Sequence, residues 1–137
     1  MLDSYMAVER EERPAPKPRI VTQDCVRVDE LLERIDGDRA FLAELVELFR
    51  ADYPEQIRKG REAVVNDDAH ALQRAAHGLK GALKNLAAPI AADLAAELEA
   101  MGKSGDITFA ASKMMELEAE VVRAVDALEA LCMEAAQ

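Results

Sequence analysis

Apolar residues recur every three or four positions along most of the chain after residue 28, which is the period of amphipathic α-helices. Turn-forming Gly, Asn, Asp and Pro residues interrupt this period between the apolar segments. The pattern predicts helices at residues 30–35, 39–66, 69–86, 89–101 and 107–134. Long helices with one apolar stripe each, joined by short turns, predict an all-α fold: an antiparallel up-down four-helix bundle with a short additional N-terminal helix.

Aspartates stand where most of these helices are predicted to begin, and an aspartate side chain can accept hydrogen bonds from the N–H groups of a first turn. The expected capping residues are Asp29, Asp38, Asp67 or Asp68, and Asp106. Pro89 suits the first turn of its helix. Pro54 falls inside the second helix, where we expect a kink because the apolar period continues; a break is the alternative. Gly102 and Gly105 are expected to enclose a polar turn.

The apolar stripes also identify the expected core. The stripe of residues 69–86 is the most regular, with spacings of four, three, four and three. The expected core residues are Leu42, Leu45, Phe49, Tyr53, Ile57 and Val64 in the second helix; Leu72, Ala76, Leu79, Leu83 and Leu86 in the third; Ile90, Leu94 and Leu98, beside Ala91 and Ala95, in the fourth; and Met114, Leu117, Val121, Leu128 and Leu131 in the last.

The chain divides into a predicted N-terminal arm or linker, residues 1–24, and a helical bundle, residues 25–137. Pro14, Pro16 and Pro18 alternate in the arm, which favours an extended backbone. A tether to another domain and a disordered tail both fit this composition. The first residues lack a secretory signal, and no apolar run approaches the roughly 20 residues of a membrane span. We therefore expect a cytoplasmic protein that does not enter a membrane.

The net charge excludes several classes of binding partner, and the two cysteines indicate the expected redox state. A net charge of −10 repels phosphate backbones, so nucleic acid is not an expected partner, and acidic substrates and anionic lipid surfaces are disfavoured. Cys25 and Cys132 belong to no CxxC pair and have no histidine at metal-ligand spacing. Two free thiols in a reducing cytoplasm is the expected state, and a disulfide is the alternative.

The third helix carries the candidate chemistry. At about 100° per residue, His77 points roughly 140° away from the middle of the apolar stripe, so it should face solvent. An exposed imidazole is largely neutral at cytoplasmic pH, and a ring nitrogen is then free to attack phosphorus. Lys80 and Lys84 could offset the charge of a phosphorylated ring. Gly81 would leave room for a partner beside the ring, although a glycine inside a helix costs roughly 1 kcal/mol relative to alanine, and Gly78 adds a second such cost.

Each of these signals is weak alone. An exposed histidine on a helix is usually an ordinary surface residue, and this is our interpretation of His70. The spacing of seven residues between His70 and His77 is too long for the usual one-turn metal pair, so a zinc site is not expected. Most surface lysines are simply solvated, and Asn85 could serve only to end the helix.

The combination is more specific, because HGLKGALKNLAA closely resembles the motif of histidine-containing phosphotransfer (HPt) domains. That motif is His-x-Leu-Lys-Gly, then small residues, then Asn-Leu-Gly-Ala, and the resemblance covers residues 29–131. The chain has Ala87 where the family usually has glycine, and Leu83 and Lys84 are larger than the family's usual residues. The matched residues are His77, Leu79, Lys80, Gly81, Ala82, Asn85, Leu86 and Ala88.

The resemblance implies a phosphoryl carrier in a two-component phosphorelay, with His77 as phosphoacceptor assisted by Lys80, Gly81 and Lys84. Its implied partners are receiver domains of response regulators and a hybrid sensor histidine kinase, in a bacterial cytoplasm. The receiver would supply Mg²⁺, so the chain, a monomer, would need no cofactor and have no kinase or ATPase activity. Docking is expected on the exposed face of the second helix and on the third helix, at Gln73, Arg74, Gly78 and Asn85.

Two other functions compete with this interpretation. One is a helical interaction module that has lost phosphotransfer, which the intact His77, Lys80 and Gly81 argue against. The other is an enzyme that uses His77 as a general base, for which no orienting carboxylate is evident in the sequence. The upstream kinase, the downstream receiver and any larger hybrid kinase that contains the chain are not specified by the sequence.

Overall fold

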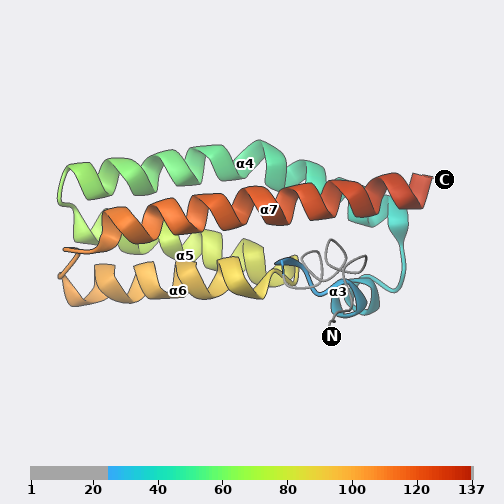
Figure 1. Ribbon diagram of the computed structural model, residues 1–137, viewed down its shortest axis with the longest axis horizontal. Coiled ribbons are helices and arrows are strands. Elements are labelled where there is room, and N and C mark those ends of the chain that lie inside the picture. The colour runs from blue at the N-terminus through green and yellow to red at the C-terminus, as the bar shows by residue number, and fades with distance from the viewer. Residues whose placement is uncertain (1–24, 137) are drawn as a thin grey trace, which may run out of the picture.

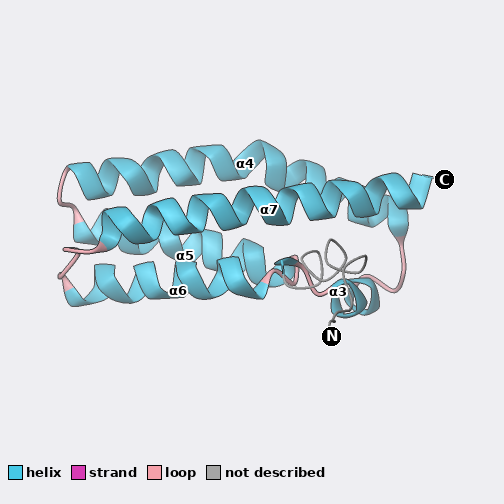
Figure 2. Ribbon diagram, viewed as in Figure 1, coloured by secondary structure: helices cyan, strands magenta, loops and turns pink. Residues whose placement is uncertain are grey.

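The computed structural model describes residues 25–136 and consists of helices joined by short turns (Figures 1 and 2). The four long helices lie side by side, and the chain reverses direction at each turn between them (Figure 1). The all-α fold and the additional N-terminal helix are therefore confirmed, while the predicted arm, residues 1–24, lies outside the described residues. The helices are α3 (Val28–Arg34), α4 (Arg39–Val65), α5 (Ala69–Asn85), α6 (Pro89–Ser104) and α7 (Ala110–Ala136).

Two of the expected helix caps are confirmed and two are wrong. Asp38 accepts a hydrogen bond from the backbone N–H of Phe41, and Asp68 accepts one from that of Ala71, so both satisfy first-turn donors. Asp29 instead lies inside the first turn of α3, which has no side-chain cap. Asp106 binds the backbone N–H and hydroxyl of Thr108 in a turn that precedes α7. A local side-chain-to-backbone bond there competes with helix initiation.

The core follows the predicted stripes with few exceptions. Every predicted core residue of α5 and of α7 is buried, and α4 continues unbroken through Pro54. Leu45, Tyr53, Val64 and Leu94 are only partly buried, because they lie at the edges of their stripes. The expectation for Ile90 is wrong, since it is 39% exposed while Ala91 and Ala92 pack inward.

The prediction that Gly102 lies in the turn after the fourth helix is wrong. It is buried inside α6, which continues to Ser104, and Gly105 alone ends that helix with a φ of 83°. A Cβ at Gly102 would lie 2.7 Å from the carbonyl oxygen of Ala69 and from the backbone nitrogen of Gln73. Helices α5 and α6 thus cross closely at Gly102. A residue with a side chain would push the two backbones apart, so this approach requires glycine.

The turn after α5 is built without the glycine that the family motif has. Ala87 adopts a left-handed conformation with a φ of 56°, and its N–H donates to the carbonyl oxygen of Lys84. Ala88 donates to Leu83, and the carbonyl oxygen of Ala87 accepts from Arg27 at 2.7 Å. The left-handed conformation costs an alanine about 1–2 kcal/mol, which the backbone hydrogen bonds and the burial of Ala87 offset.

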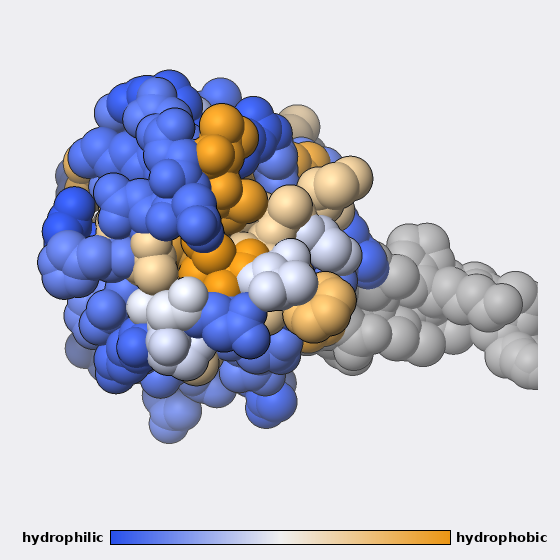
Figure 3. Space-filling view, turned by 90° about the vertical axis from the view of Figure 1, so that its left-hand side faces the viewer, coloured by the Kyte–Doolittle hydropathy of each residue, from blue (hydrophilic) through white to orange (hydrophobic). Residues whose placement is uncertain are grey.

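The end of the bundle that carries the α4–α5 and α6–α7 turns is mostly polar, with a strip of apolar surface across it (Figure 3). Two large apolar side chains are exposed at this end: Val65, the last residue of α4, and Phe109, which precedes α7. Single exposed apolar residues are normal on protein surfaces, so this strip alone assigns no function.

Candidate functional site

His77 lies near the middle of α5, and its side chain is 70% exposed. Leu72, Ala76, Leu79 and Leu83 are buried on the opposite side of the helix and fix its rotation. The predicted solvent-facing imidazole is thus confirmed.

The imidazole is held by a carboxylate from the neighbouring helix. Nδ1 of His77 lies 2.8 Å from Oε2 of Glu99 on α6. The other carboxylate oxygen, Oε1, accepts from Nζ of Lys80 at 2.6 Å. The side chain of Glu99 is only 8% exposed. The sequence did not make an orienting carboxylate for His77 evident, and the fold supplies one from α6.

The charge state of Glu99 determines which ring nitrogen can react. The hydrogen bond from Lys80 is the main cause that lowers the pKa of Glu99, burial opposes it, and the contact with His77 lowers the pKa further. Glu99 is consequently ionised at neutral pH and can only accept hydrogen bonds. Nδ1 of His77 therefore donates to this carboxylate, so in the neutral imidazole the lone pair lies on Nε2 of an exposed ring.

Glu99 comes close to His77 because of the glycine crossing. Glu99 is one turn before Gly102 on α6, and His77 is one turn after Gln73 on α5, so the contact of Gly102 with Gln73 sets the register of the two helices. A signal for Glu99 was present in the sequence. It lies on the buried side of α6, between Ala95 and Gly102, where an unpaired carboxylate would be costly.

The glycines beside His77 leave open surface. A Cβ at Gly81 would meet no other atom within 4 Å, and one at Gly78 would lie 3.8 Å from Oε1 of Gln56 on α4. Neither glycine is required by packing within the described part of the chain. Their cost of about 1 kcal/mol each in a helix is therefore unexplained by the fold itself.

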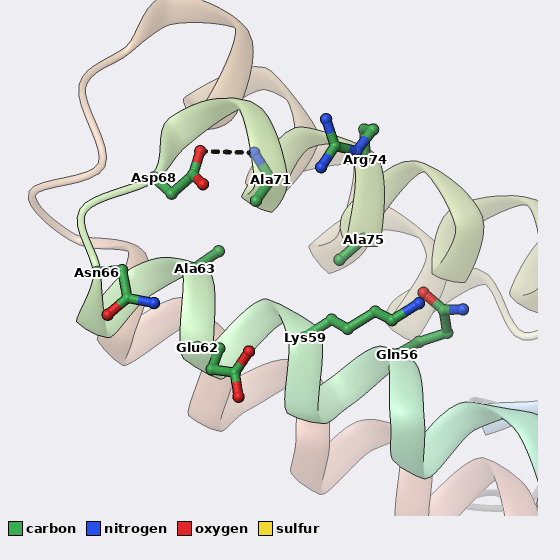
Figure 4. Close-up of a pocket in the computed structure, with 9 residues that line it drawn as sticks. All are labelled: Gln56, Lys59, Glu62, Ala63, Asn66, Asp68, Ala71, Arg74 and Ala75. Carbon is green, nitrogen blue, oxygen red and sulfur yellow. Dashed lines mark hydrogen bonds between the residues drawn. The ribbon is translucent and has the colours of Figure 1, made fainter.

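Two grooves run between α4 and α5 to the side of His77. One has a volume of about 280 Å³ and is lined by Gln56, Lys59 and Arg74, among others (Figure 4). The other, about 400 Å³, is lined mainly by apolar side chains that include Leu48, together with Asn85. Arg74 and Asn85, two of the predicted docking residues, thus lie in different grooves.

A comparison with protein families now adds to this geometry. The family model described as Hpt domain matches residues 44–132, which is more than half of the chain. The chain belongs to the Hpt domain family. No curated protein and no solved structure matches it. The match begins within α4 and extends into α7, so it includes His77, Lys80 and Glu99 but not α3. Hpt domains are phosphotransfer carriers, not kinases, and they interact with receiver domains and kinases in phosphorelays.

The remaining predicted site residues of this Hpt domain lie apart from the His77 contacts. Gln73 is half-buried against Gly102. Lys84 is two turns beyond His77 and lines a groove with Arg27 and Arg34 near the end of α5. The structure therefore groups Lys80 with His77 and Glu99, whereas the assisting role of Lys84 stays a prediction.

Within residues 25–136, no three His, Cys, Asp or Glu side chains are grouped so that they could hold a metal ion. No helix in that range is both long and apolar enough to cross a membrane.

Proposed function

We propose that this Hpt domain carries a phosphoryl group on Nε2 of His77 and relays it between the aspartates of receiver domains in a two-component phosphorelay. The observation that carries the proposal is the hydrogen bond between Nδ1 of His77 and the buried carboxylate of Glu99. That hydrogen bond supports a proton on Nδ1 and, in the neutral ring, a nucleophilic Nε2 at the surface.

The proposed transfer needs few groups from this chain. Nε2 attacks the phosphorus of an aspartyl phosphate, the N–P bond forms, and the P–O bond to the aspartate breaks, which releases its carboxylate. Nδ1 keeps its proton throughout and stays bound to Glu99. As the bond forms the ring gains positive charge, and the adjacent carboxylate stabilises that charge. The reverse sequence passes the group to the next receiver.

Lys80 has two uses in this scheme. Its contact with Glu99 at 2.6 Å keeps the carboxylate ionised and fixed in place. Its side chain is also 24% exposed and follows His77 by one helical turn, so in this proposal it supplies positive charge for the phosphoryl group of a modified ring. Lys80 thereby acts as a positioning residue for Glu99 and as a source of charge at the site.

The partner supplies the remaining chemistry in this proposal. A receiver domain brings the aspartate and Mg²⁺, and a hybrid sensor histidine kinase stands upstream. The chain then needs no cofactor and no ATPase activity of its own, and it works as a monomer in a bacterial cytoplasm. The exposed Gly78 and Gly81 leave space for a receiver to approach the ring.

The alternatives are less well supported. The contacts among His77, Lys80 and Glu99 are complete, which disfavours a module that has lost phosphotransfer. Glu99 does provide the orienting carboxylate that a general base requires, so that earlier objection to an enzyme no longer holds. However, His77 stands on an exposed ridge and lines none of the grooves described above, so a small substrate would not be enclosed.

The test is phosphoryl transfer from receiver domains of the same organism, phosphorylated in the presence of Mg²⁺. We expect transfer to the wild-type chain, none to His77→Gln, and undiminished transfer to His70→Gln, which changes an exposed histidine of the same helix. Nitrogen-15 spectra should show an Nδ1-protonated ring before transfer and phosphorylation at Nε2 afterwards. Labelling of the His77→Gln variant, or no labelling of wild type by any receiver, would contradict the proposal.

A further inference from the structure

We propose that the buried carboxylate of Glu99 also sets the direction of phosphoryl transfer, because its negative charge stabilises phosphorylated His77 more than the free ring. The inference rests on the proposed function and adds to it how the site is regulated: phosphoryl groups accumulate on this chain. A carboxylate that only oriented the ring would change the forward and reverse rates by the same factor. One that acts through its charge changes the equilibrium as well.

Phosphorylation changes the charge of the ring that Glu99 contacts. The free imidazole is neutral and donates from Nδ1 to Oε2 of Glu99 over 2.8 Å. When Nε2 forms its bond to phosphorus and Nδ1 keeps its proton, the ring becomes positively charged and the phosphoryl group is negative. The same hydrogen bond then joins a cation to an anion, an attraction that the free ring lacks.

The surroundings of Glu99 preserve this attraction. Its side chain is only 8% exposed, so salt and water screen it less than they screen a surface carboxylate. Lys80 binds the other oxygen, Oε1, at 2.6 Å, and this hydrogen bond is the main cause that lowers the pKa of Glu99. Lys80 offsets part of the carboxylate's charge, but it also follows His77 by one helical turn. The pair therefore matches in sign the positive ring and the negative phosphoryl group.

The other charged side chains near His77 contribute less. Arg74 lies one turn before it and Lys84 two turns after it on α5, and Lys59 of α4 lines a groove with Arg74. All three are exposed, and none of them hydrogen-bonds to the ring in the described part of the chain. Water screens their charges, whereas Glu99 contacts the ring directly.

His70 provides an internal reference for the effect of Glu99. It is exposed on the same helix, two turns before His77, and makes no hydrogen bond or ion pair within residues 25–136. Its phosphorylation therefore involves no carboxylate contact. The ratio of phosphorylated His77 to phosphorylated His70 at equilibrium consequently reports what Glu99 adds.

The experiment needs no partner protein. Phosphoramidate phosphorylates imidazoles directly: a ring nitrogen attacks phosphorus, the bond from phosphorus to the amine nitrogen breaks, and ammonia leaves. Excess ammonia makes the step reversible, so both histidines exchange with one donor, and phosphorus-31 spectra give the ratio of their occupancies. We expect that ratio to fall about tenfold on Glu99→Gln. The matched control is Glu97→Gln, at an exposed glutamate of the same helix, which should change the ratio less than about twofold.

Wild type in urea provides a second measurement in case Glu99→Gln alters the helices seen by circular dichroism. Unfolding removes the contact with Glu99, so the ratio of His77 to His70 phosphorylation should fall there as well. A ratio that Glu99→Gln leaves unchanged or raises in a folded chain would overturn the inference. Equal ratios for folded and unfolded wild type would overturn it too.

Receiver domains of the same organism separate this inference from the proposed function. Glu99 is not part of the receiver, so Glu99→Gln should shift the equilibrium from phosphorylated His77 towards the receiver's aspartyl phosphate by the same factor of about ten. A changed ratio without transfer from any receiver would support the inference and contradict the carrier function. Transfer from a receiver with an unchanged ratio would support the carrier function and contradict the inference.

Discussion

The two sides of α5 differ in how completely their polar groups are satisfied. On the α6 side, Glu99 is buried and paired with both His77 and Lys80, and Gly102 brings the two helices close together. On the α4 side, grooves remain open, and Lys59 and Arg74 make no ion pair within the described residues, although the charge of Glu55 acts on Lys59. The difference indicates that contacts on the α6 side, and not on the α4 side, hold the imidazole in place.

The largest expected effect comes from neutralising the carboxylate on the α6 side. Glu99→Gln removes the charge that fixes the Nδ1 proton, and we expect phosphoryl transfer to fall by about 10- to 100-fold while receiver affinity is unchanged. The measurement is the single-turnover transfer rate, with nitrogen-15 shifts of His77 to report a changed ring tautomer. The matched control is Glu97→Gln, which alters an exposed glutamate on α6 that pairs with Lys113. Equal rates for Glu99→Gln and wild type would mean that the buried contact is only structural.

The next effect concerns the crossing that places Glu99. Gly102→Ala would put a Cβ 2.7 Å from backbone atoms of α5, and we expect a loss of about 1–3 kcal/mol in the free energy of unfolding, together with slower transfer. Denaturant titration measures the former. Gly60→Ala is the control, because there the Cβ meets only the flexible end of Met114. A Gly102→Ala chain as stable as wild type would show that the helices can separate at little cost.

The smallest effect is expected from Gly81→Ala, which should raise the stability of the fold and lower the rate of phosphoryl transfer. Gly81→Ala adds a side chain in open space, so we expect a gain of about 0.5–1 kcal/mol in the free energy of unfolding. Transfer should nevertheless slow, because the methyl group occupies the surface that the receiver approaches. Gly78→Ala offers a comparison at a second exposed helical glycine, where a similar gain in stability is expected. If Gly81→Ala transferred as fast as wild type, the steric role of that glycine would be excluded.

Much of the fold could be predicted because it depends on local patterns. The stripe from Leu72 to Leu86 placed His77 on the exposed side of α5, and Asp38 and Asp68 cap helices as expected. The errors arose where a tertiary contact or a local turn overrode the pattern. Gly102 resembled a turn residue, but it is the crossing point of two helices.

The sequence by itself determined the helices, the buried stripes and the outward direction of His77, since these follow from a period of 3.6 residues per turn. It also carried the motif that identifies the family. Only the tertiary structure decided which carboxylate orients the ring. Glu99 lies 22 residues from His77 on another helix, so their contact depends on helix register and rotation. Helical periodicity fixes the face of one helix but contains no information about which residue of a neighbour lies opposite.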